Sequence, residues 1–206
     1  MQHNLLNAVV SHSSVKFKKT QGSTAVRKGC AEMEKRHILI CGERGVGKST
    51  LVEKLVKHLN VPVYGFFTRM FEADERGYCP LHMFSPADTQ RRRTAENHVA
   101  DCNGAKPLVN TAVFDNLGIE LLEKRRGVLV MDELGVMENG SPAFCEAVLR
   151  HLDGDEPIIA TVKAKKSDFL DKVRSHPNAE LYYITVENRD SLYEQLLPVI
   201  QSWNNE

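Results

Sequence analysis

The sequence predicts an α/β fold in which a central, mostly parallel sheet carries helices on both faces. Three observations lead to this prediction. Short apolar runs alternate with stretches of helical periodicity along most of the chain, as in parallel strands joined by crossover helices. A glycine-rich turn follows the first apolar run directly. A later apolar run, residues 128–131, ends in two carboxylates, and such residues at the carboxyl end of a parallel strand are placed to meet a ligand.

The composition is ordinary for one globular domain: 206 residues, 42% of them apolar, and a formal net charge of zero. No apolar run reaches the roughly 18–20 residues that span a bilayer, and no secretory signal opens the chain. The five cysteines are scattered, so neither a disulfide framework nor a zinc site is predicted. We therefore expect a cytoplasmic protein with no nucleic-acid or membrane partner.

Residues 1–32 differ from the rest of the chain. Residues 1–31 hold five of the 27 basic side chains and none of the 27 acidic ones. Their polar composition lacks sustained periodicity, which indicates a segment that buries too little apolar surface to fold. We predict a basic, disordered extension over residues 1–32 and one domain over 33–206, for which Met33 could serve as the start. An organellar transit peptide is the alternative for the extension.

The first predicted strand, residues 38–41, leads into Gly-Glu-Arg-Gly-Val-Gly-Lys-Ser, and an amphipathic helix follows. This stretch matches the P-loop pattern G-x-x-x-x-G-K-[ST]. Its glycines let backbone N–H groups converge on phosphate oxygens, and the N-terminus of the helix favours a bound anion. We expect Lys48 to reach the β- and γ-phosphates and Ser49 to ligate Mg²⁺. The predicted nucleotide-binding residues here are Gly42, Glu43, Arg44, Gly45, Val46, Gly47, Lys48, Ser49 and Thr50.

The next part of the chain predicts a second strand and an insertion. Residues 61–68 form the strand, and Gly65 inside it indicates either a close backbone approach or a bulge. Residues 70–83 predict a β-hairpin that turns at 73–77, and the polar stretch that follows completes a lid-like insertion. Within it, Arg91–Arg93 form either a solvated helix face or a mobile basic element over the phosphates.

A helix over residues 115–124 precedes the apolar run that ends in Asp132 and Glu133. After a P-loop, this pattern is typical of a Walker B strand, in which Asp132 would hold the magnesium and Glu133 would activate the attacking water. Successive side chains on a strand point to opposite faces. Asp132 and Glu133 can therefore serve the same site only if the strand ends there and the backbone turns.

The remaining sequence predicts two further strands and three helices. The predicted elements are helix 142–152, strand 157–162, a helix capped by Ser167 that extends to 176, strand 181–186 and helix 188–203. The loop Glu187-Asn188-Arg189 follows the last strand at its carboxyl end, so Asn188 and Arg189 are candidate nucleotide-binding residues. Arg189 could stack on a base without selecting it, while Asn188 could instead cap the final helix.

Four stretches resemble the small family of P-loop nucleoside-triphosphatases that includes the thermostable and the cancer-related enzymes. These stretches are residues 42–50, 65–68, 132–138 and 185–189. The resemblance extends from about Arg36 to the C-terminal helix. It implies magnesium-dependent hydrolysis of ATP, GTP and other nucleoside triphosphates to the diphosphate and phosphate, with slow turnover and broad base specificity.

The chain departs from the pattern of this family in three places. Glu43-Arg44 replaces a proline-rich interior of the P-loop, and Arg69-Met70-Phe71-Glu72 stands where the family carries an acidic residue and an arginine three residues later. The family's Gly-x-Tyr strand is not evident near Val109.

Two alternatives to hydrolysis stay open. The first is phosphoryl transfer to an acceptor that Arg91–Arg93 would clamp, and the second is a nucleotide-dependent binding module for an unknown protein partner. Glu133 disfavours the first, because it is suited to activating water. The chain lacks the guanine-reading N-K-x-D motif, so guanine specificity is not predicted.

Overall fold

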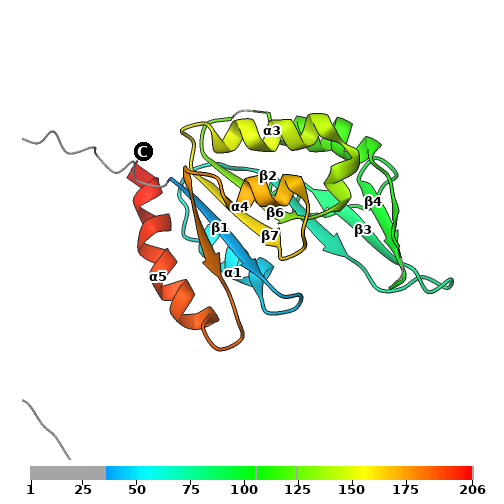
Figure 1. Ribbon diagram of the computed structural model, residues 1–206, viewed down its shortest axis with the longest axis horizontal. Coiled ribbons are helices and arrows are strands. Elements are labelled where there is room, and N and C mark those ends of the chain that lie inside the picture. Colours follow the sequence, from blue (N-terminus) through cyan, green and yellow to red (C-terminus); the bar gives the residue numbers. More distant parts are fainter. Residues whose placement is uncertain (1–35, 105, 124, 206) are drawn as a thin grey trace, which may run out of the picture. The chain divides into compact units, whose positions relative to one another are not determined.

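The computed structural model of the protein describes residues 36–104, 106–123 and 125–205. The extension predicted over residues 1–32 and the candidate start at Met33 lie outside the described residues. The described residues form one eight-stranded sheet with the strand order β5-β4-β3-β2-β6-β7-β1-β8 (Figure 1). The strands are β1 (His37–Gly42), β2 (Val63–Met70), β3 (Cys79–Phe84), β4 (His98–Cys102), β5 (Leu108–Val109), β6 (Val128–Leu134), β7 (Ile158–Lys163) and β8 (Ala179–Tyr183).

Five helices and three short helical turns lie between and after these strands in the described ranges. The helices are α1 (Lys48–Val56), α2 (Ile119–Leu121), α3 (Pro142–Leu152), α4 (Asp168–Arg174) and α5 (Arg189–Ser202), and the turns are η1 (Phe114–Gly118), η2 (Met137–Gly140) and η3 (Trp203–Asn205). The prediction of helix 142–152 is confirmed with both its bounds. Helix 115–124 is shorter than predicted, since it consists of the π-helical turn η1 and the single turn α2.

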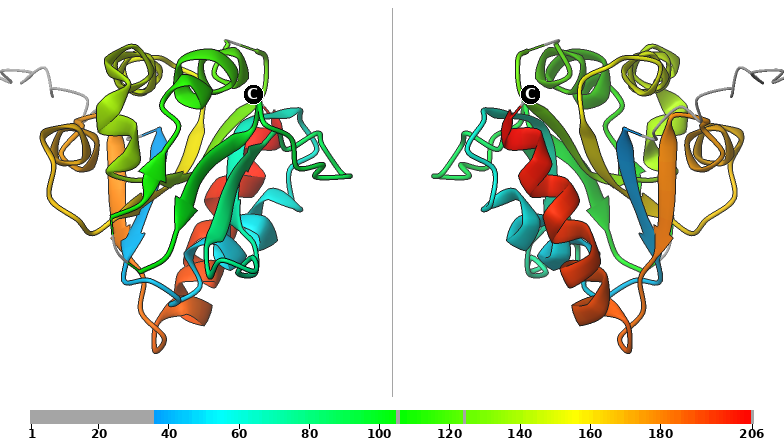
Figure 2. Two further views of the ribbon diagram at one scale, coloured as in Figure 1. Left: turned by 90° about the vertical axis from the view of Figure 1, so that its right-hand side faces the viewer. Right: turned by 90° about the vertical axis from the view of Figure 1, so that its left-hand side faces the viewer.

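The predicted α/β class is confirmed, with helices on both faces of the sheet. Strands β2, β6, β7, β1 and β8 run parallel to one another. Helices α1 and α5 pack on one face, where Ile38 and Ile40 of β1 contact them, whereas α3 and α4 pack on the other, where Leu39 points (Figure 2). Because both faces are covered, the parallel strands are apolar at nearly every position.

The predicted hairpin is confirmed, but the insertion is part of the sheet. Strands β2 and β3 pair antiparallel, and Gly77 in the turn between them has a φ of +78°. Beyond the hairpin, β4 pairs with β3 and β5 pairs with β4, so the sheet continues past β2 (Figure 1). The polar interpretation of residues 85–107 missed β4, because His98 and Asp101 break its apolar pattern.

Gly65 makes a close backbone approach, as one of its two interpretations predicted. Its φ is +102°, and a Cβ built on it would lie 2.1 Å from the carbonyl oxygen of Val130 in the neighbouring strand β6. Gly65 and Val130 are paired in the register of β2 and β6. The glycine therefore lets β2 lie against the strand that carries Asp132 and Glu133.

None of the helices in the described ranges is long and apolar enough to cross a membrane.

Candidate active site

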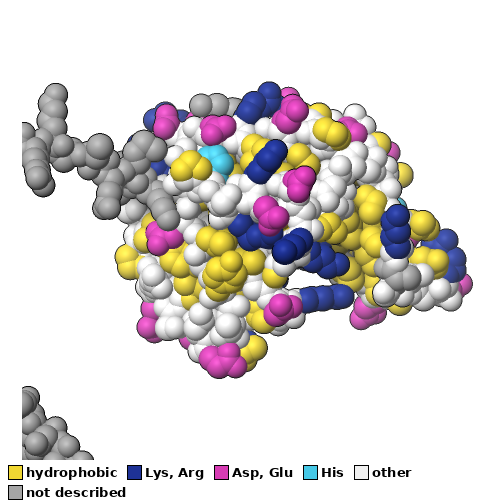
Figure 3. All heavy atoms as spheres, viewed as in Figure 1, with side chains coloured by type: hydrophobic (Ala, Val, Ile, Leu, Met, Phe, Trp, Pro, Cys, Tyr) yellow, Lys and Arg dark blue, Asp and Glu magenta, His cyan; other side chains and the backbone are white. Residues whose placement is uncertain are grey.

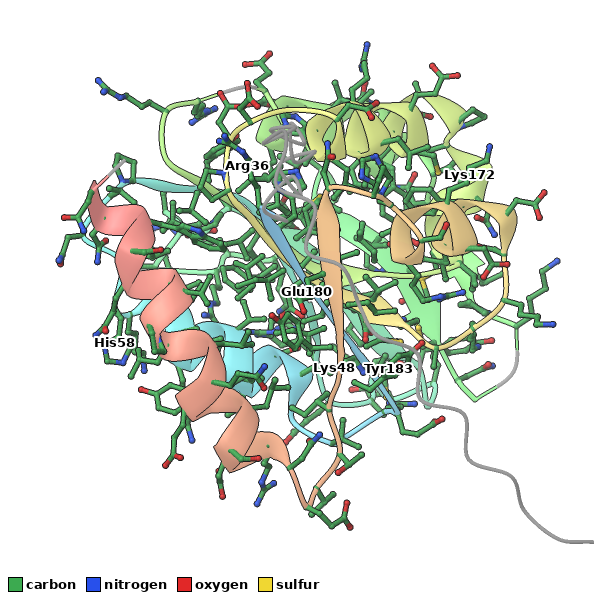
Figure 4. The ribbon with its side chains drawn as sticks, turned by 60° about the vertical axis from the view of Figure 1, so that its left-hand side comes forward. Arg36, Lys48, His58, Lys172, Glu180 and Tyr183 are labelled. Atoms are coloured by element: carbon green, nitrogen blue, oxygen red, sulfur yellow. The ribbon has the colours of Figure 1, made fainter. Side chains whose placement is uncertain are left out.

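The parallel register brings the two acidic residues and the P-loop to one edge of the sheet. In the strand order, β7 lies between β6 and β1, so the carboxyl ends of these three strands are neighbours. Figure 4 shows Lys48 and Tyr183 at the carboxyl end of β1 and β8, with Arg36 near the opposite end. Lys and Arg side chains gather beside acidic ones on the face that shows the loops after β1 and β7 (Figure 3).

Asp132 is fully buried at this edge, with none of its surface exposed. Its Oδ1 accepts hydrogen bonds from Ser49 Oγ at 2.9 Å and from Thr161 Oγ1 at 2.5 Å. Arg69 donates to Oδ2 at 3.3 Å. Burial raises the pKa of Asp132 above its usual value, while the bonds from Thr161 and Ser49 and the charge of Arg69 act against that shift.

Glu133 faces the P-loop from the next position of the chain. Its Oε1 lies 3.0 Å from Lys48 Nζ, and the same ammonium donates to the carbonyl oxygens of Gly42 and Glu43, each at 3.0 Å. The register between β6 and β7 shifts between Met131 and Leu134. Strand β6 continues to Leu134, so the expected end of the strand at these residues is wrong. Its pairing with β7 is irregular there, and the two successive side chains both reach the site with different partners.

The P-loop adopts the conformation that its glycines allow. Gly45 has a φ of +83° and Gly47 one of +106°, and Gly47 is the residue before the first turn of α1. Among the other predicted residues, Glu43, Arg44 and Thr50 are exposed, and Val46 and Ser49 are partly buried. Backbone N–H groups at this turn and at the start of α1 are the donors that a phosphate group binds.

The oxygen ligands at this edge fit a magnesium ion. Ser49 contributes a hydroxyl and Asp132 a carboxylate, and hard oxygen donors of this kind suit Mg²⁺. In the part of the chain that the structure describes, no group of three or more His, Cys, Asp or Glu side chains could hold a metal ion. Mg²⁺ keeps several waters and takes few protein oxygens, so one hydroxyl and one carboxylate suit it.

Three residues of the site were missed by the sequence analysis: Thr161, Arg69 and Lys163. Thr161 contributes a hydroxyl from inside the buried strand β7, and no pattern in the neighbouring sequence indicates that it belongs to the site. Arg69 occupies a position where the chain departs from the pattern of the family that it resembles, and that departure is the signal that could have found it. Its guanidinium pairs with both Asp132 and Glu53 of α1.

Like Arg69, the Arg91–Arg93 segment contacts α1, the helix that follows the P-loop. These residues form no helix, so that part of the interpretation was wrong, although all three are exposed. The Arg91 guanidinium lies 3.6 Å from Glu53 Oε1, and the Arg93 guanidinium lies over the ring of Phe71. Glu53, one turn of helix beyond Ser49, thus pairs with Arg69 of β2 and with Arg91 of the loop between β3 and β4.

The loop before α5 lies beside the P-loop. Asn188 does not cap α5 through its side chain. Asn188 occupies the N-cap position of α5, as the capping alternative predicted, but its Oδ1 accepts a bond from the Thr185 N–H at 2.7 Å and its Nδ2 donates to the Tyr183 carbonyl at 2.9 Å. This amide fixes the loop that presents Arg189, which is exposed and whose Cδ lies 4.0 Å from the position of a Cβ on Gly47.

Glu138 supports the loop that follows β6. Its Oε1 accepts the Gly135 N–H at 3.0 Å, and only 3% of the residue is exposed. Burial raises its pKa to about 7, and the negative charge of Glu133 adds to this effect, while Lys163 opposes it. Glu138 therefore stabilises the loop after β6 and does not face Lys48 of the P-loop.

A separate cavity lies away from these charged groups. It has a volume of about 610 Å³ and is lined by residues at the start of β6 and its neighbours, among them Pro62, Arg126, Val128 and Trp203. This is the amino end of the strands, opposite the P-loop. We place the candidate site at the carboxyl edge, because the phosphate-binding turn and the paired carboxylates converge there.

The sequence and the fold are similar to those of known proteins. The model of the NTPase family matches residues 37–197. Nucleoside-triphosphatase THEP1 of Methanocaldococcus jannaschii is 34% identical over 171 residues, which cover 78% of this chain and 94% of that relative. The cancer-related nucleoside-triphosphatase homolog of Mus musculus is 26% identical over 185 residues, covering 81% and 97%. The crystal structure of THEP1 from Aquifex aeolicus has a TM-score of 0.63 and 29% identity, and the match covers 80% of this chain and 99% of that one.

The raised pKa of Glu138 predicts a pH-dependent stability. The folded protein keeps the proton up to about pH 7, whereas an unfolded glutamate loses it near its ordinary pKa of 4.5, so stability falls as pH rises between these values. Glu138→Gln keeps the acceptor for Gly135 and removes the buried charge. We expect it to raise the Tm at pH 8 by roughly 5 °C, equivalent to about 2 kcal/mol in a chain of this size.

At pH 5 the difference in Tm should be much smaller, because Glu138 is then neutral in the folded protein. Glu146→Gln, which changes an exposed carboxylate on α3, is the matched control and should leave the Tm unchanged at both values. If Glu138→Gln changes the Tm by the same amount at pH 5 and at pH 8, the result contradicts a raised pKa of Glu138 in the folded protein.

Proposed function

We propose, since the chain belongs to the NTPase family and is a nucleoside-triphosphatase, that it hydrolyses nucleoside 5′-triphosphates to the diphosphate and phosphate with magnesium and little choice of base. Magnesium dependence, base tolerance and the roles of individual residues are the parts of this proposal that go beyond membership of the family.

One observation supports the proposal most strongly: each carboxylate at the end of β6 pairs with a different residue of the P-loop. Asp132 meets Ser49, and Glu133 meets Lys48, although the hydrogen-bonded side chains of the first pair are 83 residues apart. A phosphate held by the P-loop would therefore lie within reach of both carboxylates. Hydrolysis needs these two roles, a partner for the metal and a base for the water.

The backbone N–H groups of the P-loop would bind the β- and γ-phosphates, and Lys48 would contribute its charge to them. In this role Lys48 must exchange part of its present bonding, to Gly42, Glu43 and Glu133, for phosphate oxygens. Glu133 would then orient the attacking water and accept its proton. Proton acceptance by a positioned carboxylate contributes typically 10²- to 10⁴-fold to a rate.

Ser49 and Asp132 are the residues that would hold the magnesium ion. When bound, the ion supplies charge neutralisation for the phosphate oxygens. Burial and the hydroxyl of Thr161, which donates to one carboxylate oxygen, support this role of Asp132. Arg69 donates to the other carboxylate oxygen of Asp132, so a protein cation also lies beside this carboxylate.

Broad base specificity is supported by the position of Arg189. A planar guanidinium can stack on the face of any base, and stacking alone does not select one base over another. The side chain is exposed beside Gly47. Asn188 is engaged in holding the loop, so we assign it the positioning of Arg189 rather than contact with the base.

Replacing Glu133 tests the hydrolytic role. Glu133→Gln keeps the size of the side chain and its hydrogen bonding but removes the base, so kcat for ATP should fall by roughly 10² or more while MgATP binding is retained. Phosphate release is measured with ATP, GTP, CTP, UTP, their deoxy forms and the diphosphates, with and without magnesium, and again after addition of candidate acceptors.

Glu75→Gln in the exposed hairpin turn is the control and should keep the original rate. Full turnover by Glu133→Gln would remove this residue from the mechanism. Phosphate that appears on an added acceptor instead of in solution would favour phosphoryl transfer.

Replacing Arg189 tests base recognition. Arg189→Ala should raise KM for ATP and GTP alike by roughly fivefold, equivalent to about 1 kcal/mol of stacking, and should barely change kcat. Arg150→Ala, an exposed arginine on α3, serves as the control. If KM is unchanged for every nucleotide, Arg189 does not contact the base, and a rise for one nucleotide alone would mean that it selects the base.

A further inference from the structure

Lys163 is the last residue of β7, the strand between β6 and β1. In the parallel register it is paired with Gly42, the first residue of the P-loop. The chain therefore places a second lysine at the carboxyl edge, between the P-loop and the end of the strand that carries Glu133. Its side chain is 34% exposed, so it lies partly buried at the protein surface.

The two oxygens of Glu133 contact different lysines. Oε1 lies 3.0 Å from Lys48 Nζ, and Oε2 lies 3.4 Å from Lys163 Nζ. The Glu133 side chain is 21% exposed, so both contacts are partly shielded from water. A carboxylate held at both oxygens by cations from two different elements has little freedom to rotate.

The surroundings of Lys163 direct its ammonium toward this carboxylate. Gly135 leaves the space for it: a Cβ at position 135 would lie 3.2 Å from Lys163 Cδ and 3.4 Å from its Nζ. The same point lies 3.4 Å from Oε2 of the buried Glu138. Acidic groups therefore face the Lys163 ammonium from both the end of β6 and the loop after it.

We propose that Lys163 is a positioning residue for Glu133, which it holds in place while Lys48 binds the nucleotide. The inference rests on the proposed function, in which Lys48 turns to the β- and γ-phosphates and loses part of its contact with Glu133. Lys163 is fixed to the other carboxylate oxygen and has no such second task. It keeps the carboxylate at the reacting phosphate at the stage when the water must be oriented.

This role affects turnover and leaves affinity unchanged. A displacement of about 1 Å in a catalytic group can lower a rate by roughly 10²-fold, whereas binding of the phosphates depends on the P-loop. A lysine that bound the phosphates itself would instead change KM. A lysine that only stabilised the fold would change Tm, and it would lower activity whether or not position 133 carried a charge.

The test combines Lys163 and Glu133 variants in a double-mutant cycle. Lys163→Met keeps the aliphatic chain and removes the charge, and Lys163→Arg keeps the charge. Lys166→Met, an exposed lysine in the following loop, is the control. For each protein, kcat and KM for MgATP are measured by phosphate release, and Tm is measured to verify folding.

We expect Lys163→Met to lower kcat by roughly 10- to 100-fold with KM within about twofold of the original. Lys163→Arg should recover most of the rate, and Lys166→Met should match the unchanged protein. In the Glu133→Gln background, Lys163→Met should lower kcat by less than about twofold, because the neutral amide no longer depends on the ion pair.

Three outcomes would overturn the inference. An unchanged kcat for Lys163→Met, when Glu133→Gln alone is slow, rejects the positioning role and leaves the proposed function in place. A loss of rate that persists in the Glu133→Gln background, with a higher KM, means that Lys163 contacts the phosphates. Normal turnover by Glu133→Gln itself rejects the proposed role of Glu133, and the inference fails with it.

Discussion

A carboxylate without solvent exposure must find its hydrogen-bond donors inside the protein, and Asp132 imposes this requirement on the whole carboxyl edge of the sheet. Its donors are Ser49 from α1, Thr161 from β7 and Arg69 from β2. Three elements must therefore meet the end of β6 in fixed positions. Removing one partner from a buried cluster of charged groups leaves another charge without compensation. The positions of these residues are therefore strongly constrained.

The second layer of the site is a balance of charge around Glu133. Lys48 and Lys163 contact its two oxygens, and Lys48 is also bound to two carbonyl groups of the P-loop. A triphosphate that enters this edge competes with Glu133 for Lys48. Binding of the substrate and the freedom of the base are thus coupled through one ammonium group, which links affinity to the chemical step.

The sequence predicted the parts of the site that depend on local pattern. The P-loop, the apolar strand ending in Asp132 and Glu133, and the special backbone of Gly65 all follow from neighbouring residues. Thr161, Arg69 and Lys163 lie on other strands, and only the tertiary register brings them to the same edge. Strand β4 was missed because polar residues interrupt its apolar pattern. Asn188 stands at the predicted cap position of α5, but its side chain bonds backward to its own loop, which the sequence did not indicate.

The most direct test of this account is the effect of magnesium on nucleotide affinity, measured by calorimetry with ATP in magnesium and in EDTA. The unchanged protein should bind ATP more tightly with magnesium. Asp132→Asn preserves the shape of the side chain and the acceptor for Ser49 and Thr161, and it should lose most of this difference while still binding ATP through the P-loop. An Asp132→Asn protein that retains the full magnesium enhancement would contradict the assignment of Asp132 as the partner of the metal.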